Sequence, residues 1–318
     1  MGVRNILLEF INCYPEIIVY LEKENTNITV SRVSIDVLTI LVGIRRMFNN
    51  HADVIRVTTA KICSLIRKLK PVVDVLLCFD GSTPQLKRTN FNNNLFLERD
   101  LTKNLKFSLT NLVNNVIFDS SCNEGEGDWK IISKVENLPK LCSEWVCVSF
   151  DNDLIISSVI KSNAYPRWLC TRVPSNSKRS DKNKMILLDI EKLRRINTPE
   201  QFATLVPLLG CDFLKNLANP KNLKMILERF KDNKKDVLFL DVLLDALNHL
   251  SSNRKKINFQ YWNSYLNDLS WTLNYLGGDN KSYDPIEIPR NVPLTPYQNI
   301  LSNKDFYREI LKIDFLKI

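Results

Sequence analysis

Short β-branched runs alternate with longer stretches of helical periodicity through the first three fifths of this sequence. Such alternation is typical of an α/β fold, in which a central, mostly parallel twisted sheet lies between helices. The expected strands span residues 33–38, 72–79, 115–118, 145–150 and 185–189. The expected helices span residues 5–22, 52–70, 95–112, 126–135 and 154–162. Ligands of such sheets bind outside the carboxyl ends of the strands, so chemically useful residues are expected there.

The pattern becomes mainly helical beyond residue 198. Helices are predicted from Pro199, from Pro220 to Phe230, and over 236–250 and 259–276, with a last one near 304–311. The polar, basic segment 174–184 lacks periodicity and is predicted to be a loop. We therefore expect a first domain over residues 1–215 and a helical region over 216–318 that packs against it.

Composition favours a polyanionic partner and excludes several other classes. The 318 residues carry a formal net charge of +9, and clustered Lys and Arg gain affinity for nucleic acid by releasing counterions. Eight cysteines without a CxxC pair and only two histidines make a zinc site improbable. The absence of a membrane-spanning run or a signal-peptide pattern predicts an intracellular protein, cytoplasmic or nuclear. High Asn, Lys and Ile content suggests an AT-rich genome, such as that of a virus infecting a host cell.

Acidic residues occur where expected strands end or where the next element begins. They are Asp36, Asp80, the pair Asp151 and Asp153, Asp212, and the pair Glu126 and Asp128. Any one of them alone is typical of a helix cap or a turn. Their repetition after apolar strands is different, because an unpaired carboxylate there costs several kcal/mol unless a cation compensates it. Hard oxygen ligands select Mg²⁺ or Mn²⁺, and two such ions serve phosphodiester hydrolysis.

Several blocks of the sequence, in order, resemble the XRN family of 5′→3′ exoribonucleases. They are the opening MGVRNILLEFINCYPEII, the strand with Asp36, FDGSTPQLKR, GEGDWKI, FDNDLI, LLGCDF and YLNDLSWTLNYL. The resemblance spans nearly the whole chain. It implies a PIN-like 5′-nuclease fold, a two-metal mechanism, and a substrate of single-stranded RNA degraded from its 5′ end by a monomeric enzyme.

Carried over residue by residue, the resemblance implies a set of metal ligands and a set of substrate contacts. The implied metal ligands are Asp36, Asp80, Glu126, Asp128, Asp151, Asp153 and Asp212. Lys87 matches the basic residue that contacts the reacting phosphate. Further basic residues implied near 91–95 are missing, which leaves Arg88 and Arg99 as candidates for the 5′ phosphate. Trp129 and Lys130, directly after the acidic pair, are the remaining expected substrate contacts.

Two other functions remain open from the sequence. Flap-type endonucleases that act on DNA share the order of carboxylates, and FDGSTPQLK is very close to their equivalent stretch. GEGDWKI and FDNDLI are closer to the exoribonucleases. A third hypothesis is a degenerate nuclease fold that binds RNA without cutting it, against which the retention of all seven acids argues.

Overall fold

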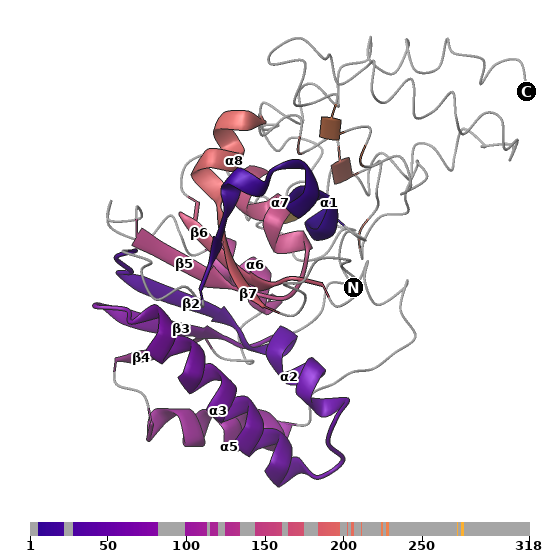
Figure 1. Ribbon diagram of the computed structural model, residues 1–318. Helices are drawn as coiled ribbons and strands as arrows, with labels where there is room; N and C mark the ends of the chain where they lie inside the picture. Colours follow the sequence, from indigo (N-terminus) through magenta and orange to yellow (C-terminus); the bar gives the residue numbers. More distant parts are fainter. Residues whose placement is uncertain are drawn as a thin grey trace, which may run out of the picture.

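A seven-stranded sheet forms the centre of the computed structural model, in the order β1-β7-β6-β5-β2-β3-β4 (Figure 1). The structure describes residues 6–21, 28–81, 99–112, 115–119, 125–133, 144–160, 165–174, 184–197, 202, 205, 206, 211, 224, 227, 228, 272, 275 and 276. The strands are β1 (Ile18–Tyr20), β2 (Arg32–Asp36), β3 (Asp74–Cys78), β4 (Val116–Asp119), β5 (Trp145–Val148), β6 (Trp168–Arg172) and β7 (Met185–Asp189).

Strands β2 to β6 pair in parallel, whereas β7 runs antiparallel to both β1 and β6. The described helices are α1 (Ile6–Cys13), α2 (Val37–Arg45), α3 (His51–Leu69), α5 (Arg99–Thr110), α6 (Gly127–Ser133), α7 (Asp153–Ile160) and α8 (Ile190–Ile196), with a 3₁₀ turn η1 (Pro15–Ile17). The prediction of an α/β fold with a mostly parallel sheet flanked by helices is confirmed.

The two faces of the sheet are buried under separate helix layers, with α1, α7 and α8 on one face and α2, α3 and α5 on the other (Figure 1). Residues of α1, α6, α7 and α8 form one apolar core with alternate side chains of the strands. Residues of α2, α3 and α5 form the second core with the other strand side chains. Helix α6 contacts β2 and β3, so it lies against the central strands of the first face.

All five expected strands are present: β7 has the predicted bounds, β4 is shifted by one residue, and β2, β3 and β5 end earlier than predicted. Strands β1 and β6 were not among the strand candidates. The single helix expected over 5–22 is wrong beyond Cys13. Pro15 disfavours helical backbone at the residue before it, and Tyr14 accordingly takes φ −130°. The chain then makes the 3₁₀ turn and enters β1, which pairs with β7. The short helices α2 and α8 were also not expected.

Helix α3, expected over 52–70, is found one residue earlier and ends in the manner the sequence favours. The Asn50 side chain accepts a hydrogen bond from the Ala52 amide, which satisfies one free N–H of the first turn. At the other end Lys70 is left-handed at φ 49°, and Pro71 follows. Buried residues on one side of α3, such as Val54, Ile62 and Leu69, then cover the sheet.

Several expectations lie outside the described residues. These include the helices over 199–311, the greater part of the 174–184 loop, the region 216–318 as a domain, and the side chains of Lys87, Arg88 and Asp212. Arg99 begins α5, but its side chain is not described. In the described part of the chain, no helix combines the length and the apolar character needed to cross a membrane.

Candidate metal centre

Three of the expected acids lie at one edge of the sheet because β2, β3 and β5 are parallel neighbours. Asp36 is the last residue of β2 and pairs in register with Cys78 of β3. Asp80 follows two residues after β3 ends, and Asp151 follows three residues after β5 ends. Parallel strands bring their carboxyl ends to the same side, so residues far apart in sequence converge.

Asp36 is at the centre of this edge and is almost fully buried, with 3% of its surface exposed. Its Oδ2 accepts a hydrogen bond from Ser149 Oγ at 3.0 Å, and its Oδ1 accepts a long one, 3.5 Å, from the Thr39 amide in α2. Burial raises the pKa of Asp36 well above its usual value, and the charges of Asp80, Asp128 and Asp151 raise it further. The four carboxylates are therefore close enough to repel one another.

Gly127 allows α6 to approach the two strand-end acids closely. Its amide donates a hydrogen bond to Asp80 Oδ1 at 2.8 Å. A Cβ at this position would lie 2.8 Å from Asp36 Oδ1 and 3.1 Å from Asp80 Oδ1, closer than side chains tolerate. Glycine therefore fits this position best. Because Gly127 has no side chain, α6 lies close to the edge and carries Glu126 and Asp128 there.

The remaining described acids are held by neighbouring groups. Glu126 is buried, and its Oε2 accepts a hydrogen bond from Tyr275 at 3.0 Å. Asp151 Oδ1 accepts from the Asp153 amide at 3.1 Å, and the Asp151 amide donates to Ser149 Oγ at 3.1 Å. Asp153 is itself buried at the start of α7. The Glu126 and Asp151 carboxylates are thus each held by a hydrogen bond, and Asp153 is enclosed by the fold.

The chemistry of this donor set fits a hard divalent cation, although its present geometry does not coordinate one. Among the described residues, no three His, Cys, Asp or Glu side chains are arranged to hold a single ion. Oδ1 of Asp80, Asp151 and Asp128 each accepts a hydrogen bond from a backbone amide, at 2.8, 3.1 and 2.7 Å. Buried, mutually repelling carboxylates are the environment that such a cation relieves.

Lys130 lies in the interior rather than at the substrate side of α6. Its Nζ donates to the Phe79 carbonyl at 2.7 Å and lies 3.6 Å from Asp119 Oδ1, and both side chains are 1% exposed. This buried pair ties α6 to the ends of β3 and β4. Asp119 is a further strand-end acid that the sequence pattern did not single out, and its charge is compensated by Lys130.

Trp129, expected to stack on a base, is stacked on Tyr275 with ring centroids 6.1 Å apart. It also packs against Gly125, where φ is 102° and a Cβ would lie 2.4 Å from the indole ring. Tyr275 therefore contacts both Trp129 and Glu126. Sequence reasoning missed Tyr275 and Ser149 as members of the site. Ser149 had a signal, since it is a polar residue that ends an apolar run directly before Phe150 and Asp151.

The fold resembles those of solved nucleases. The catalytic core of Rad2 in complex with DNA substrate superposes with a TM-score of 0.55 at 16% identity, covering 99% of this chain and 97% of that one. Human GEN1 in complex with Holliday junction DNA gives 0.50 at 12% identity, with coverage of 99% and 74%. No protein-family model and no curated protein matches the chain. The chain therefore has a PIN-like 5′-nuclease fold.

Proposed function

We propose that this protein is a metal-dependent 5′ nuclease that hydrolyses phosphodiester bonds of nucleic acid. The observation that carries the proposal is the burial of Asp36 among the repelling charges of Asp80, Asp128 and Asp151 at the carboxyl edge of the sheet. A chain gains nothing for stability from such an arrangement, since buried like charges destabilise the folded state. Divalent cations bound between these carboxylates would offset their repulsion, so the arrangement is typical of a metal-binding site.

The proposed ligands are the seven acids named from the sequence, Asp36, Asp80, Glu126, Asp128, Asp151, Asp153 and Asp212, some of them acting through water. Mg²⁺ or Mn²⁺ ions bound there would lower the pKa of an attacking water and neutralise charge on the leaving oxygen. Ser149 orients Asp36 and Asp151 at once, because its Oγ donates to one and accepts from the amide of the other. Lys87, with Arg88 and Arg99, is proposed to contact the substrate phosphates.

The preferred substrate is proposed to be single-stranded RNA degraded from its 5′ end, on the strength of the GEGDWKI and FDNDLI blocks. The second candidate is a flap-type DNA nuclease. It is favoured by the fold, because Rad2 and GEN1 were both solved with DNA. Both candidates use the same acidic edge and differ in how the strand reaches it.

One assay separates the candidates. Purified protein is incubated with 5′-monophosphate RNA, 5′-triphosphate RNA and flap DNA, in Mg²⁺ or in EDTA. Mononucleotides released from the monophosphate RNA support the exoribonuclease, whereas a single cut in the flap supports the DNA nuclease. Binding without cleavage in Mg²⁺ and in Mn²⁺ would overturn the proposed function and leave a nucleic-acid-binding module.

The matched variants are Asp151→Ala and Asp53→Ala. Asp53 is an acid of α3 that pairs with Arg56 at 3.2 Å, and it is not among the acids whose charges act on Asp36. Both substitutions remove one negative charge. We expect Asp151→Ala to abolish cleavage and preserve nucleic-acid binding, and Asp53→Ala to cleave at the wild-type rate.

A further inference from the structure

Three basic side chains gather on the α3 side of the sheet. Lys61 is half-buried on α3, Lys68 is exposed two turns further along the same helix, and Arg172 is exposed at the end of β6. Burial lowers the pKa of Lys61, and the charges of Arg172 and Lys68 lower it further. We call these three residues the basic seam. None of them belongs to the residues that the sequence pattern assigned to the site.

The charges of the basic seam are not balanced within the described part of the chain. The groups that act on Lys61 include two cations and the buried thiol of Cys170, but no carboxylate. Two exposed cations elsewhere illustrate the contrast: Arg56 pairs with Asp53 on the same helix, and Arg195 pairs with Glu191. Like charges held together with one of them partly desolvated favour an anion bound from outside.

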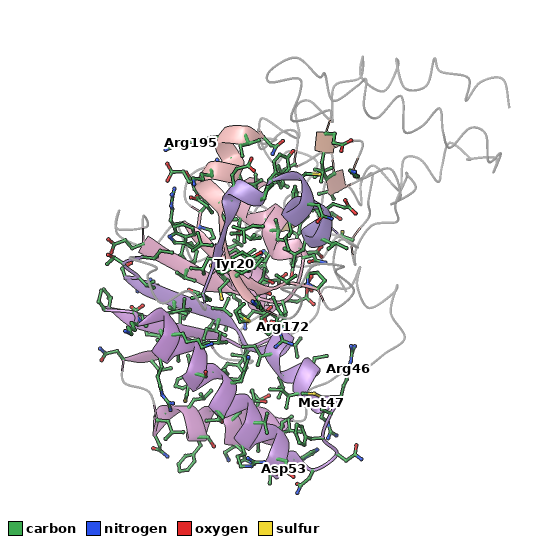
Figure 2. The ribbon with its side chains drawn as sticks, viewed as in Figure 1. Tyr20, Arg46, Met47, Asp53, Arg172 and Arg195 are labelled. Carbon is green, nitrogen blue, oxygen red and sulfur yellow. The ribbon has the colours of Figure 1, made fainter. Side chains whose placement is uncertain are left out.

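The basic seam is joined to the acidic edge by a direct contact. The Arg172 guanidinium lies 5.0 Å from the centroid of the Phe150 ring, and Phe150 directly precedes Asp151. The Phe150 amide donates to Thr39 Oγ1 at 3.3 Å, which fixes Phe150 at the start of α2. Arg172 is labelled in Figure 2, where its position on the α3 side of the molecule can be followed. The stack on Phe150 limits the freedom of the guanidinium and holds it beside the edge.

We propose that the basic seam binds the phosphate backbone of the nucleic acid whose reacting phosphodiester lies at the acidic edge. This inference rests on the proposed function and adds a second contact to it, on the opposite face of the sheet from α6. Arg172 supplies a planar fork of donors that fits a phosphate, and the two lysines supply compact charges beside it. A nucleic-acid strand carries a row of negative charges and so offers a phosphate to each of these residues.

The test measures binding and not cleavage. Asp36→Asn is used as the background so that labelled oligonucleotides stay intact, and affinity is measured at several salt concentrations for single-stranded RNA, single-stranded DNA and duplex DNA. Lys61→Gln with Arg172→Gln is expected to weaken binding about tenfold on at least one probe. It should also lower the slope of log K against log salt by about 1 to 2, since each lost phosphate contact removes roughly 0.7–0.9.

The matched control is Arg56→Gln with Arg195→Gln, two exposed cations that lie outside the seam and pair with Asp53 and Glu191. It removes the same charge, so a purely long-range effect would change both double variants equally. Equal changes, or an unchanged salt slope in the Lys61 and Arg172 variant, would overturn the proposal. Melting curves serve as the folding check, and the seam variant should melt no lower than the background because it relieves repulsion. Cleavage is measured separately with Asp36 intact. If that protein binds through the seam but cleaves no substrate, the proposed function is contradicted and the seam is not.

Discussion

Charged side chains are arranged in opposite ways at the two ends of the central sheet: they are paired at one end and repel one another at the other. At the amino end, the Arg32 guanidinium donates two hydrogen bonds to the Asp74 carboxylate, and the pair joins the first residues of β2 and β3. At the carboxyl end of the same two strands, Asp36 and Asp80 repel each other. The ion pair at one end stabilises the fold, whereas burial and neighbouring carboxylates at the other end disfavour the charged form of Asp36.

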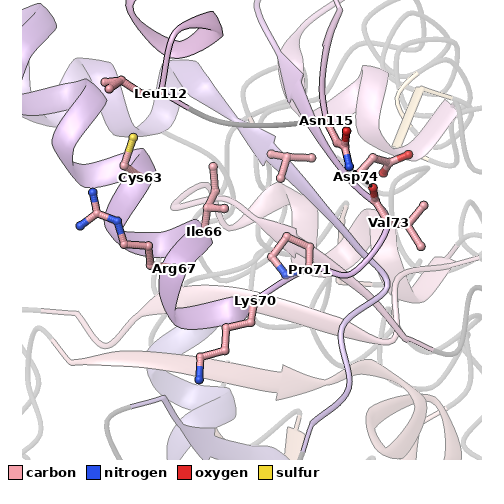
Figure 3. Close-up of a pocket in the computed structure, with 10 residues that line it drawn as sticks. Cys63, Ile66, Arg67, Lys70, Pro71, Val73, Asp74, Leu112 and Asn115 are labelled. Carbon is pink, nitrogen blue, oxygen red and sulfur yellow. Dashed lines mark hydrogen bonds between the residues drawn. The ribbon is translucent and has the colours of Figure 1, made fainter.

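The cavity described by the structure lies at the other end of the sheet from the acidic edge. A cavity of about 310 Å³ lies at the amino end, between the end of α3 and the starts of β3 and β4 (Figure 3). Val73 and Leu112 line it with exposed apolar surface, and its acidic member, Asp74, is already paired with Arg32. The end proposed to be functional is therefore distinguished by its mutually repelling carboxylates, whereas this cavity lies at the other end of the sheet.

The largest expected effect of a single substitution comes from removing the charge at the centre of the acidic edge. Asp36→Asn should lower cleavage more than about 100-fold, since even groups that only orient a metal ligand are worth 10–100-fold. The folded-state pKa of Asp36 is raised, so the stability it contributes is present at low pH and is lost as pH rises through that value. At neutral pH the substitution should therefore stabilise the metal-free protein, by about 0.5–2 kcal/mol.

Thermal unfolding with and without Mg²⁺ checks this prediction. Wild-type protein should gain about 2.7 kcal/mol at a Mg²⁺ concentration 100 times the dissociation constant, and Asp36→Asn should gain much less. If the metal-free variant is less stable than the wild type, Asp36 is compensated within the chain. The contrast between the two ends of the sheet would then disappear.

The next effect is expected at the amino end, where charge is compensated. Arg32→Met leaves the Asp74 carboxylate, which is 12% exposed, without its partner. We expect a loss of about 2 kcal/mol in the free energy of unfolding, measured by denaturant titration, with no change in the cleavage rate of the folded protein. Replacing Asp74 by Leu in the same chain should recover part of the loss. If Arg32→Met lowers the cleavage rate without loss of stability, the amino end of the sheet takes part in cleavage and the contrast between the two ends is wrong.

The sequence predicted that strand-end acids would converge on one edge, but it did not predict the contacts around them. Asp36, Asp80 and Asp151 each follow an apolar run, and parallel pairing then places them together. The hydrogen bond from Tyr275 to Glu126 joins residues 149 positions apart, so no local sequence pattern predicts it. The same holds for Lys61 and Arg172, which became neighbours through packing of α3 against the sheet.

The elements that the sequence did not predict are short or lie at one side of the sheet. Strand β1 has three residues, all only partly buried, and its apolar run lies inside the segment that was expected to be one helix over 5–22. Helix α2 begins at the residue after Asp36, and its Val-Leu-Thr-Ile start has the same β-branched character as the strand before it. Local preference extends the strand there, whereas the cap formed by Asp36 and burial of Ile40 and Leu41 favour the helix.

The smallest effect is expected from Ser149, which supports the acidic edge without carrying charge. The hydrogen bond from its Oγ lowers the pKa of Asp36, so Ser149→Ala should raise that pKa further. The acid limb of the pH profile for cleavage should then move to higher pH, with a loss of about tenfold or less near neutrality. Ser34→Ala is the matched control, because Ser34 is equally buried in the neighbouring strand but accepts from Trp145 Nε1 at 2.9 Å. Both substitutions should cost about 1 kcal/mol of stability, and only Ser149→Ala should shift the pH profile. An identical shift in both would mean that Asp36 responds to general loosening of the sheet and not to its own hydroxyl partner.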